Sequence, residues 1–178
     1  MRTSWKWMRV IGWLAMGALL FVGSAGATGQ AGFTGSTYAS GLLEDDVDVL
    51  NRIILPEGVA GSAQANLWLS LQKTRGPSVL FVQTNTWEPG GTTGWHTHPG
   101  HSLIIVTQGT ITAYDADCTP RTYSAGQVFV DQGGDHVHVL RNESTAEKAA
   151  TVAVQLVPAS ERNRRRGDAN APPGCPIL

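Results

Sequence analysis

The sequence has little charge and lacks the motifs of several common enzyme classes. Charged residues make up 15% of its 178 residues and the formal net charge is -1, whereas nucleic-acid-binding proteins carry a basic surface. There is no H-E-x-x-H, no G-x-x-x-x-G-K-[ST], and no G-x-G-x-x-G after an expected strand. Zincin peptidases, P-loop NTPases and dinucleotide-binding enzymes are therefore excluded. The length and the apolar content of 42% suit one globular domain with appendages.

The N-terminus has the pattern of a secretory signal. Three basic residues precede the apolar residues 10–22, and a small-residue A-x-A pattern ends at Ala27. We expect residues 1–27 to be removed and the protein to be secreted or held in the cell envelope. An uncleaved anchor is the alternative, because residues 10–27 are at the short limit for a membrane span. None of the 14 acidic residues lies in this segment. The remaining chain is therefore net acidic, and after cleavage we expect no membrane and no nucleic-acid partner.

Cysteine is also scarce. Cys118 and Cys175 have no CxxC partner, which excludes a redox motif and a zinc finger. In an exported chain an even number of cysteines suggests a disulfide, and two free thiols are the alternative. Such a bridge would pin a C-terminal tail, residues 159–178, to the loop around Cys118. The arginines of that tail are expected to be solvated.

Short strands dominate the expected structure. Leu67, Leu69 and Leu71 alternate with Trp68, Ser70 and Gln72, as in a half-buried strand. Further strands are expected at residues 79–87, 95–98, 102–107, 110–114, 121–123, 127–130, 136–141 and 148–157. Without a long run of helical period, this pattern indicates an all-β sandwich or barrel over residues 65–158. Residues 28–64 would form an N-terminal arm, beginning with a flexible lead-in at 28–41 that is rich in glycine, serine and threonine.

The histidines are concentrated in one part of the chain. All five lie between residues 96 and 138: His96, His98, His101, His136 and His138. Two pairs have i, i+2 spacing, which places both side chains of a pair on one face of a strand. Imidazoles so placed can converge on one metal ion, and a third from a neighbouring strand would complete a site with open positions. Imidazole ligands suit Zn, Cu, Fe and Ni.

The spacing around the first pair is that of a known motif. Gly90 is followed by five residues, then His96-Thr97-His98, three more residues, Ser102, six more residues and Gly109. This resembles the first motif of the cupin superfamily, except that Ser102 stands where the family has an acidic ligand. A second cupin motif is recognisable from Gly126 to Asn142, with one extra residue in its loop. Counting back from Asn142 places the family's histidine ligand at His138.

The resemblance implies a double-stranded β-helix, the jelly-roll barrel of cupins, with a metal inside the barrel mouth. The implied ligands are His96, His98 and His138. The alternates are His136 on the same strand face as His138, His101 if its turn reorients it, and Ser102 at the acidic position. The ion would be a divalent transition metal, Zn, Cu, Fe, Mn or Ni.

Ser102 changes the expected chemistry of the site. Neutral histidines alone leave the full charge of the ion in place, which makes a bound water more acidic and moves the site away from the pattern of two histidines and one carboxylate. Glu88 and Asp135, both in loops, could replace the missing carboxylate. A degenerate cupin without metal is the remaining alternative.

Two functions stay open at this stage. One is a metal-dependent, oxygenase-like enzyme acting on a small organic substrate, and the other is a non-catalytic module that binds a small molecule or a metal. No general acid or base stands out near the histidines. In either case a small-molecule ligand is expected, and a homodimer is left open.

Overall fold

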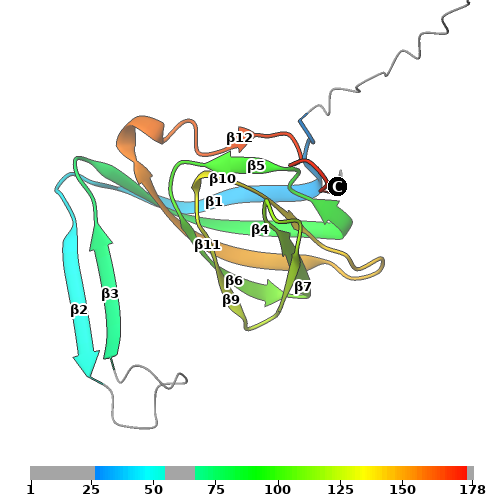
Figure 1. Ribbon diagram of the computed structural model, residues 1–178, viewed down its shortest axis with the longest axis horizontal. Coiled ribbons are helices and arrows are strands. Elements are labelled where there is room, and N and C mark those ends of the chain that lie inside the picture. Colours follow the sequence, from blue (N-terminus) through cyan, green and yellow to red (C-terminus); the bar gives the residue numbers. More distant parts are fainter. Residues whose placement is uncertain (1–26, 55–66, 176–178) are drawn as a thin grey trace, which may run out of the picture.

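The computed structural model describes residues 27–54 and 67–175, and these residues are almost entirely β-structure (Figure 1). The strands are β1 (Ala31–Leu43), β2 (Asp48–Ile54), β3 (Leu67–Lys73), β4 (Ser78–Thr92), β5 (His96–His98), β6 (Ser102–Gln108), β7 (Thr110–Tyr114), β8 (Pro120–Ser124), β9 (Val128–Asp131), β10 (Gly134–Arg141), β11 (Ala149–Pro158) and β12 (Gly167–Asp168). A short 3-10 helix, η1 (Ala159–Glu161), precedes β12. The predicted all-β class is confirmed, and each strand expected between residues 79 and 157 corresponds to one observed strand.

The barrel is a jelly roll of antiparallel strands arranged around β4. Strand β1 pairs with one edge of β4 and β11 with the other, and β6 and β9 follow beyond β11. Strand β10 pairs with β5 and β7, and β8 extends the sheet from β7. The two halves of the second expected motif, on β9 and β10, are thereby brought beside the first motif on β5 and β6.

Period-two alternation determines what faces inward. On β6, Ile104 and Val106 are buried while Leu103 and Ile105 are exposed. The inward apolar residues form one cluster: Trp87, Ile104, Val106, Ile111, Ala113, Phe129, Leu140, Ala149 and Ala153. The same inward faces also carry polar side chains, among them Ser102 at the start of β6 and His138 on β10. The barrel interior is therefore part core and part polar site.

The expected flexible lead-in at residues 28–41 is wrong. Strand β1 pairs with β4 from Ala31 to Leu43, and Phe33 lies 4.9 Å from Trp87 between ring centroids. Edge pairing uses backbone groups, so a strand rich in glycine, serine and threonine can form wherever a neighbouring edge is free. Composition alone does not report such an edge.

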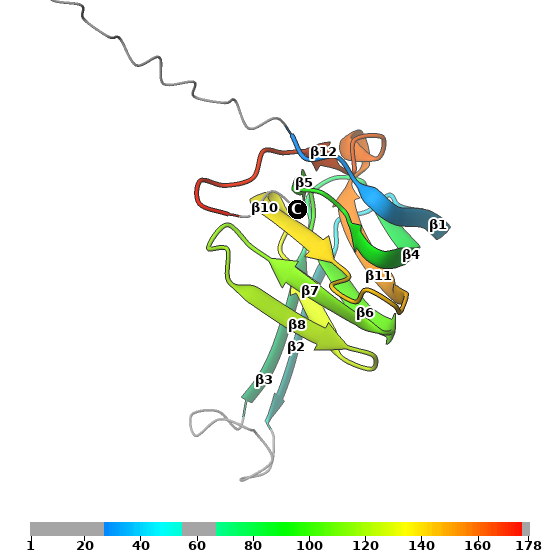
Figure 2. The same cartoon turned by 90° about the vertical axis from the view of Figure 1, so that its right-hand side faces the viewer.

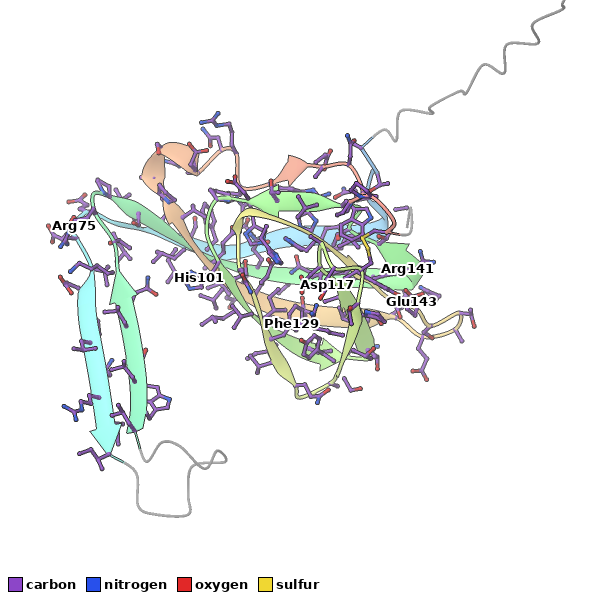
Figure 3. The ribbon with its side chains drawn as sticks, in the orientation of Figure 1. Arg75, His101, Asp117, Phe129, Arg141 and Glu143 are labelled. Atoms are coloured by element: carbon purple, nitrogen blue, oxygen red, sulfur yellow. A yellow bond between two sulfur atoms is a disulfide. The ribbon has the colours of Figure 1, made fainter. Side chains whose placement is uncertain are left out.

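Strands β2 and β3, here called the arm, form a separate two-stranded sheet that extends away from the barrel (Figure 1). The strand predicted at residues 67–72 is therefore present, but it pairs with β2 and not with a barrel strand. At the base of the arm Thr74 donates its backbone N–H to Val47, at 2.8 Å. Arg75, labelled in Figure 3, forms an ion pair with Asp46 at 3.0 Å where the arm joins the barrel.

The C-terminal tail runs back across the barrel. Figure 2 shows β12 beside β5, and the two strands pair at Gly167 with Thr97 and at Asp168 with His96. The predicted disulfide is present between Cys118 and Cys175, with Cα atoms 5.1 Å apart and a sequence separation of 57. In the chain-entropy model a loop of that length stabilises the fold by about 4 kcal/mol. The tail is thus held at both ends.

The predicted solvation of the tail arginines is wrong for two of them. Arg165 and Arg166 are half-buried, and Arg166 donates from Nη2 to the carbonyl of Thr93 at 2.6 Å. The pairing of β12 with β5 turns this part of the tail inward, which the charge pattern of the sequence does not reveal.

The predicted signal peptide lies, except for Ala27, outside the described residues. Within the part of the chain that the structure describes, no helix is long and apolar enough to cross a membrane.

Candidate metal centre

Two histidines come from β5. His96 and His98 flank the half-buried Thr97, so both imidazoles point to the buried side. The chain enters β5 through Gly94, which has a φ of +66°, and a Cβ added there would lie 2.1 Å from the carbonyl oxygen of Thr28. Only glycine fits this position. The carbonyl of Gly94 accepts a hydrogen bond from Nδ1 of His96 at 2.9 Å, so the same turn also orients the first imidazole.

A third histidine comes from β10. His138 is the direct Cα partner of His96 in the β10–β5 pairing and is 2% exposed. The Nε2 atoms of these two residues lie 3.1 Å apart. The structure thus brings together the three histidines that the resemblance implies as ligands.

A fourth group, Asp131, was not predicted. It ends β9, and its Oδ2 lies 2.6 Å from Nε2 of His98 and 2.7 Å from Nε2 of His138. The donor atoms of His96, His98, His138 and Asp131 all lie within 4.8 Å of one another, and all four residues are buried. The cluster therefore combines three imidazoles with one carboxylate.

Asp131 occupies the place across from Ser102. The two residues are Cα partners in the β6–β9 pairing, so the carboxylate that the first motif lacks on β6 is supplied by the adjacent strand. The site is therefore dominated by histidines, as expected, but it is not the purely neutral ligand set that Ser102 suggested. One negative charge offsets part of the ion's field, and the inferences drawn from a purely neutral ligand set do not hold.

The sequence did contain a signal for Asp131. It directly follows the strand expected at 127–130 and has the same parity as Phe129, which is buried, so on a strand one residue longer its side chain faces inward. The replacement carboxylates expected from the sequence, Glu88 and Asp135, were placed in loops, which is wrong, because they lie on β4 and β10. Glu88 is exposed and forms an ion pair with Lys148 at 2.6 Å, and Asp135 is exposed.

The alternate residues lie in different surroundings. His101, labelled in Figure 3, lies in the loop between β5 and β6 and outside the cluster. His136 is also outside it, with Nδ1 at 3.9 Å from Asp115, but its backbone carbonyl accepts from Nδ1 of His138 at 3.1 Å. Ser102 is buried and lines the same cavity as His96 and His98.

Backbone carbonyls determine the tautomer of all three clustered imidazoles. Nδ1 of His96 binds the carbonyl of Gly94, Nδ1 of His98 that of Gly100, and Nδ1 of His138 that of His136. A carbonyl can only accept, so each Nδ1 carries the proton and each neutral ring presents the lone pair of Nε2 to the centre. This is the usual arrangement around metal-binding histidines.

The charges of the cluster are strongly coupled. Burial acts to raise the pKa of Asp131, but hydrogen bonds from His138 and His98 hold it well below its usual range. Burial acts to lower the pKa of His98, but the hydrogen bond and the charge of Asp131, together with the bond to Gly100, raise it overall. Burial and the neighbouring charges of His138 and Arg166 lower the pKa of His96. Without a metal, protons hold the carboxylate and the imidazoles together.

The donor set fits a divalent transition metal. The Nε2 atoms of His96 and His138 lie 3.1 Å apart, and Nδ1 of each ring already donates to a backbone carbonyl. The two Nε2 atoms therefore share no proton unless one ring is charged. Oδ1 of Asp131 is buried without a hydrogen-bond partner among the described residues. Three imidazoles and a carboxylate suit Zn, Cu, Fe and Ni, with the carboxylate extending the range to Mn.

A cavity of about 260 Å³ adjoins the cluster. It is bordered by His96, His98 and Asp131, by apolar side chains such as Trp87 and Ile104, and by the two tail arginines. Its volume is slightly below the range of about 300–1,000 Å³ usual for drug-sized ligands. The cavity therefore suits a small molecule placed next to the cluster.

The chain is similar to known proteins in sequence profile and, over part of its length, in structure. The sequence profile of the family described as "Cupin domain" matches residues 84–154. Among solved structures, a cupin-like protein from Thermotoga maritima is 21% identical with a TM-score of 0.44, and covers 53% of this chain and 74% of its own. An oxalate oxidase is 22% identical with a TM-score of 0.38, and a polyketide cyclase from Streptomyces resistomycificus is 17% identical with a TM-score of 0.39.

These two alignments cover less than half of the present chain, 46% for the oxidase and 43% for the cyclase. They span 47% of the oxidase and 54% of the cyclase. No curated protein sequence matches the chain. The profile match covers both motifs and every member of the cluster, within a jelly-roll barrel whose strand order brings them together. Residues 84–154 of the chain are therefore a cupin domain.

Proposed function

We propose that His96, His98, His138 and Asp131 hold one divalent transition metal ion, and that the ion acts on a small organic molecule bound in the adjoining cavity. The observation that carries the proposal is the convergence of three Nε2 atoms and a carboxylate oxygen within 4.8 Å, with every Nδ1 held by a backbone carbonyl. Such fixed tautomers favour metal binding because the ligands need no rearrangement.

Four protein donors limit which ions leave room for a substrate. A tetrahedral ion would be saturated by them, whereas an octahedral ion keeps two further positions. We therefore favour a metal that accepts six ligands, such as Fe, Mn or Ni. When bound, the ion supplies Lewis-acid or redox chemistry to whatever occupies the cavity.

The chain's own residues hold and shield the substrate. Trp87, Ile104 and Leu140 offer apolar contact and reduce access of water, and the amides of Asn85 and Gln155 offer hydrogen bonds. Asp131 is the one carboxylate among the described residues bordering the cavity, and the histidines engage it. With no uncommitted acid or base there, a non-catalytic binding module is the second candidate.

Metal content after purification under native conditions tests the proposal. We expect about one divalent ion per chain, and none in His96→Ala/His98→Ala. The control His101→Ala/His136→Ala removes the same number of histidines from outside the cluster, and should retain the ion. Metal-free wild-type protein that also fails to bind added ions would refute the metal site. Oxygen uptake by iron-, copper- and manganese-loaded protein with phenolic and sugar substrates then separates an oxygenase from a binding module.

We also propose that the protein is exported. The N-terminal signal pattern and the Cys118–Cys175 bridge support this, because disulfides persist in oxidising compartments. Cleavage after Ala27 would keep Thr28, whose Oγ1 accepts from the backbone N–H of Trp95 at 2.8 Å beside the cluster. N-terminal sequencing of protein from its native host tests this, with Thr28 expected first and retention of Met1 as the contrary result.

A further inference from the structure

We propose that the cavity beside the metal centre recognises the carboxylate of a small organic acid through Arg165, an inference that rests on the proposed function and narrows its substrate class. Nη2 of Arg165 donates to Thr37 Oγ1 at 3.2 Å, and the guanidinium lies 4.1 Å above the ring of Phe81. Its Nη1 is buried and has no hydrogen-bond partner among the described residues. The guanidinium is therefore held in place while its buried Nη1 group remains without a partner.

A second unused polar atom borders the same cavity. Gln155 on β11 is 5% exposed, and its Oε1 has no hydrogen-bond partner within the described residues. Among the described residues, Trp87 Nε1 and Asp131 Oδ1 at the same cavity also lack a partner. Buried polar groups are nearly always satisfied, so such atoms gathered around one cavity indicate a polar ligand. The planar fork of arginine matches a carboxylate, and the amide of Gln155 suits a second polar group such as a hydroxyl.

The charge of the cavity selects an anion. Two guanidinium groups and one carboxylate border it among the described residues, and that carboxylate, Asp131, faces His98 and His138. Arg166 is already engaged with Thr93 and Asp168. A divalent ion would add further positive charge. The apolar walls at Trp87 and Ile104 favour an organic anion over an inorganic one.

Paired ligands of equal size test the role of charge. Lactate and lactamide differ in their carboxylate and amide, and both are titrated into metal-loaded protein by calorimetry. We expect lactate to bind and lactamide to bind at least about tenfold more weakly. Arg165→Gln should lower lactate affinity at least about tenfold and leave metal content unchanged. Arg164→Gln is the matched control, because Arg164 is 76% exposed and pairs with Glu161 on the surface.

The outcomes separate this inference from the metal site. Equal affinity for lactate and lactamide, or no loss in a folded Arg165→Gln, would overturn the inference even if the metal is bound. Absence of metal together with lactate binding that depends on Arg165 would refute the metal site and keep the carboxylate site. Should Arg165→Gln fail to fold, Arg165→Lys keeps the charge but not the fork, and an unchanged lactate affinity in it would count against the proposal.

A separate observation concerns the surface. One face of the arm carries five apolar side chains, Leu50, Ile54, Leu67, Leu69 and Leu71, with exposures from 40% to 67%. The same face also carries Arg52, opposite Leu69, and the Asp48–Lys73 ion pair at its end. The outer face of the barrel sheet carries a second apolar patch, here called the sheet patch, at Leu80, Leu103, Ile105, Val128, Val130 and Val154. None of the described residues covers either surface, and contiguous apolar patches usually mark an interface.

We propose that a second copy of the chain covers both surfaces, with the arm of each copy lying on the sheet patch of the other. The arm extends away from its own barrel (Figure 1), and a two-stranded sheet is marginally stable alone. A symmetric exchange buries both surfaces twice and leaves neither over. A membrane is a poorer occupant, because the described basic residues on that face are only Arg52 and Lys73, and Lys73 pairs with Asp48 at 3.0 Å.

Mixing two variants tests this arrangement. Leu69→Lys/Leu71→Lys changes the arm, and Leu103→Lys/Val130→Lys changes the sheet patch. Each should be monomeric by light scattering where wild type is dimeric, and Ser70→Lys on the other arm face should remain dimeric. An equimolar mixture should regain dimers, because one intact arm meets one intact patch. A monomeric wild type would overturn the proposal. A mixture that stays monomeric would also overturn it, and this is the result expected if arms pack on arms and patches on patches.

Discussion

The barrel mouth and the arm reverse the usual distribution of side chains in opposite ways. In the mouth, three histidines and an aspartate are buried, whereas in the arm leucines and isoleucines are exposed. Buried polar groups are costly without partners, and exposed apolar area forgoes the main stabilising contribution to folding. The two proposals above supply a partner for each region, a metal ion for the mouth and a second chain for the arm.

The two regions differ in how firmly contacts within the chain fix their geometry. Each imidazole of the mouth is fixed by a carbonyl two residues away in sequence, so the geometry of the donors exists before any ion binds. The arm is held by its own backbone pairing and by contacts at its base, such as that of Arg75 with Asp46. A preorganised site favours affinity, while an unsupported apolar sheet favours association.

The largest expected effect is the loss of Asp131 from the mouth. Asp131→Ala removes the one anionic donor, so metal affinity should fall at least about 100-fold, beyond the range seen when indirect partners of ligands are lost. Competitive titration with a chromogenic chelator measures it. Asp135→Ala, which removes an exposed acid from the adjacent strand β10, should change affinity less than about twofold. Equal losses in the two variants would show that the cluster is not the site.

Much of the fold could be predicted because strand alternation and turn residues are local signals. The strands from 79 to 157 follow from period two, and the convergence of His96, His98 and His138 from the resemblance to the cupin motifs. Asp131 was missed because its parity only places it inward, whereas its role as a ligand depends on the pairing of β9 with β6, a long-range register. Strand β1 and the half-buried Arg165 were missed for a similar reason, since each is placed by a sheet edge or a tail contact far away in sequence.

A variant that moves the carboxylate from Asp131 on β9 to position 102 on β6 tests whether the two positions face the same metal ion. Ser102 and Asp131 are cross-strand partners, so Ser102→Glu/Asp131→Ser should return metal affinity to within about tenfold of wild type. Asp131→Ser alone should remain weak. Ser102→Glu alone adds a second carboxylate and should favour Mn²⁺ and Fe²⁺ over Zn²⁺ and Cu²⁺. Failure of the double variant to recover, when folded, would show that the two positions do not face the same ion.

Acidity should weaken the metal site by a moderate amount. Asp131 raises the pKa of His98 above its usual range, so the protonated ring is favoured below that raised pKa and the metal must displace its proton there. Affinity should therefore fall as pH drops from about 8 to about 6, at most about tenfold per unit for each displaced proton. In Asp131→Asn the pKa of His98 falls back, so the decline should begin at a lower pH. Chelator competition at a series of pH values measures both curves.

The smallest expected effect lies in the arm and concerns the barrel's own stability. Leu69→Thr/Leu71→Thr changes two residues that are 57% and 64% exposed, so at concentrations where the chain is monomeric the free energy of unfolding should change by less than about 0.5 kcal/mol. Ile104→Ala, in the barrel core at 4% exposure, should lose about 3 kcal/mol by comparison. Urea unfolding followed by tryptophan fluorescence measures both. At higher concentration wild type should gain stability from association while the arm variant does not. A large loss in the arm variant at low concentration would mean that the arm packs within its own chain, and the contrast between the two regions would then disappear.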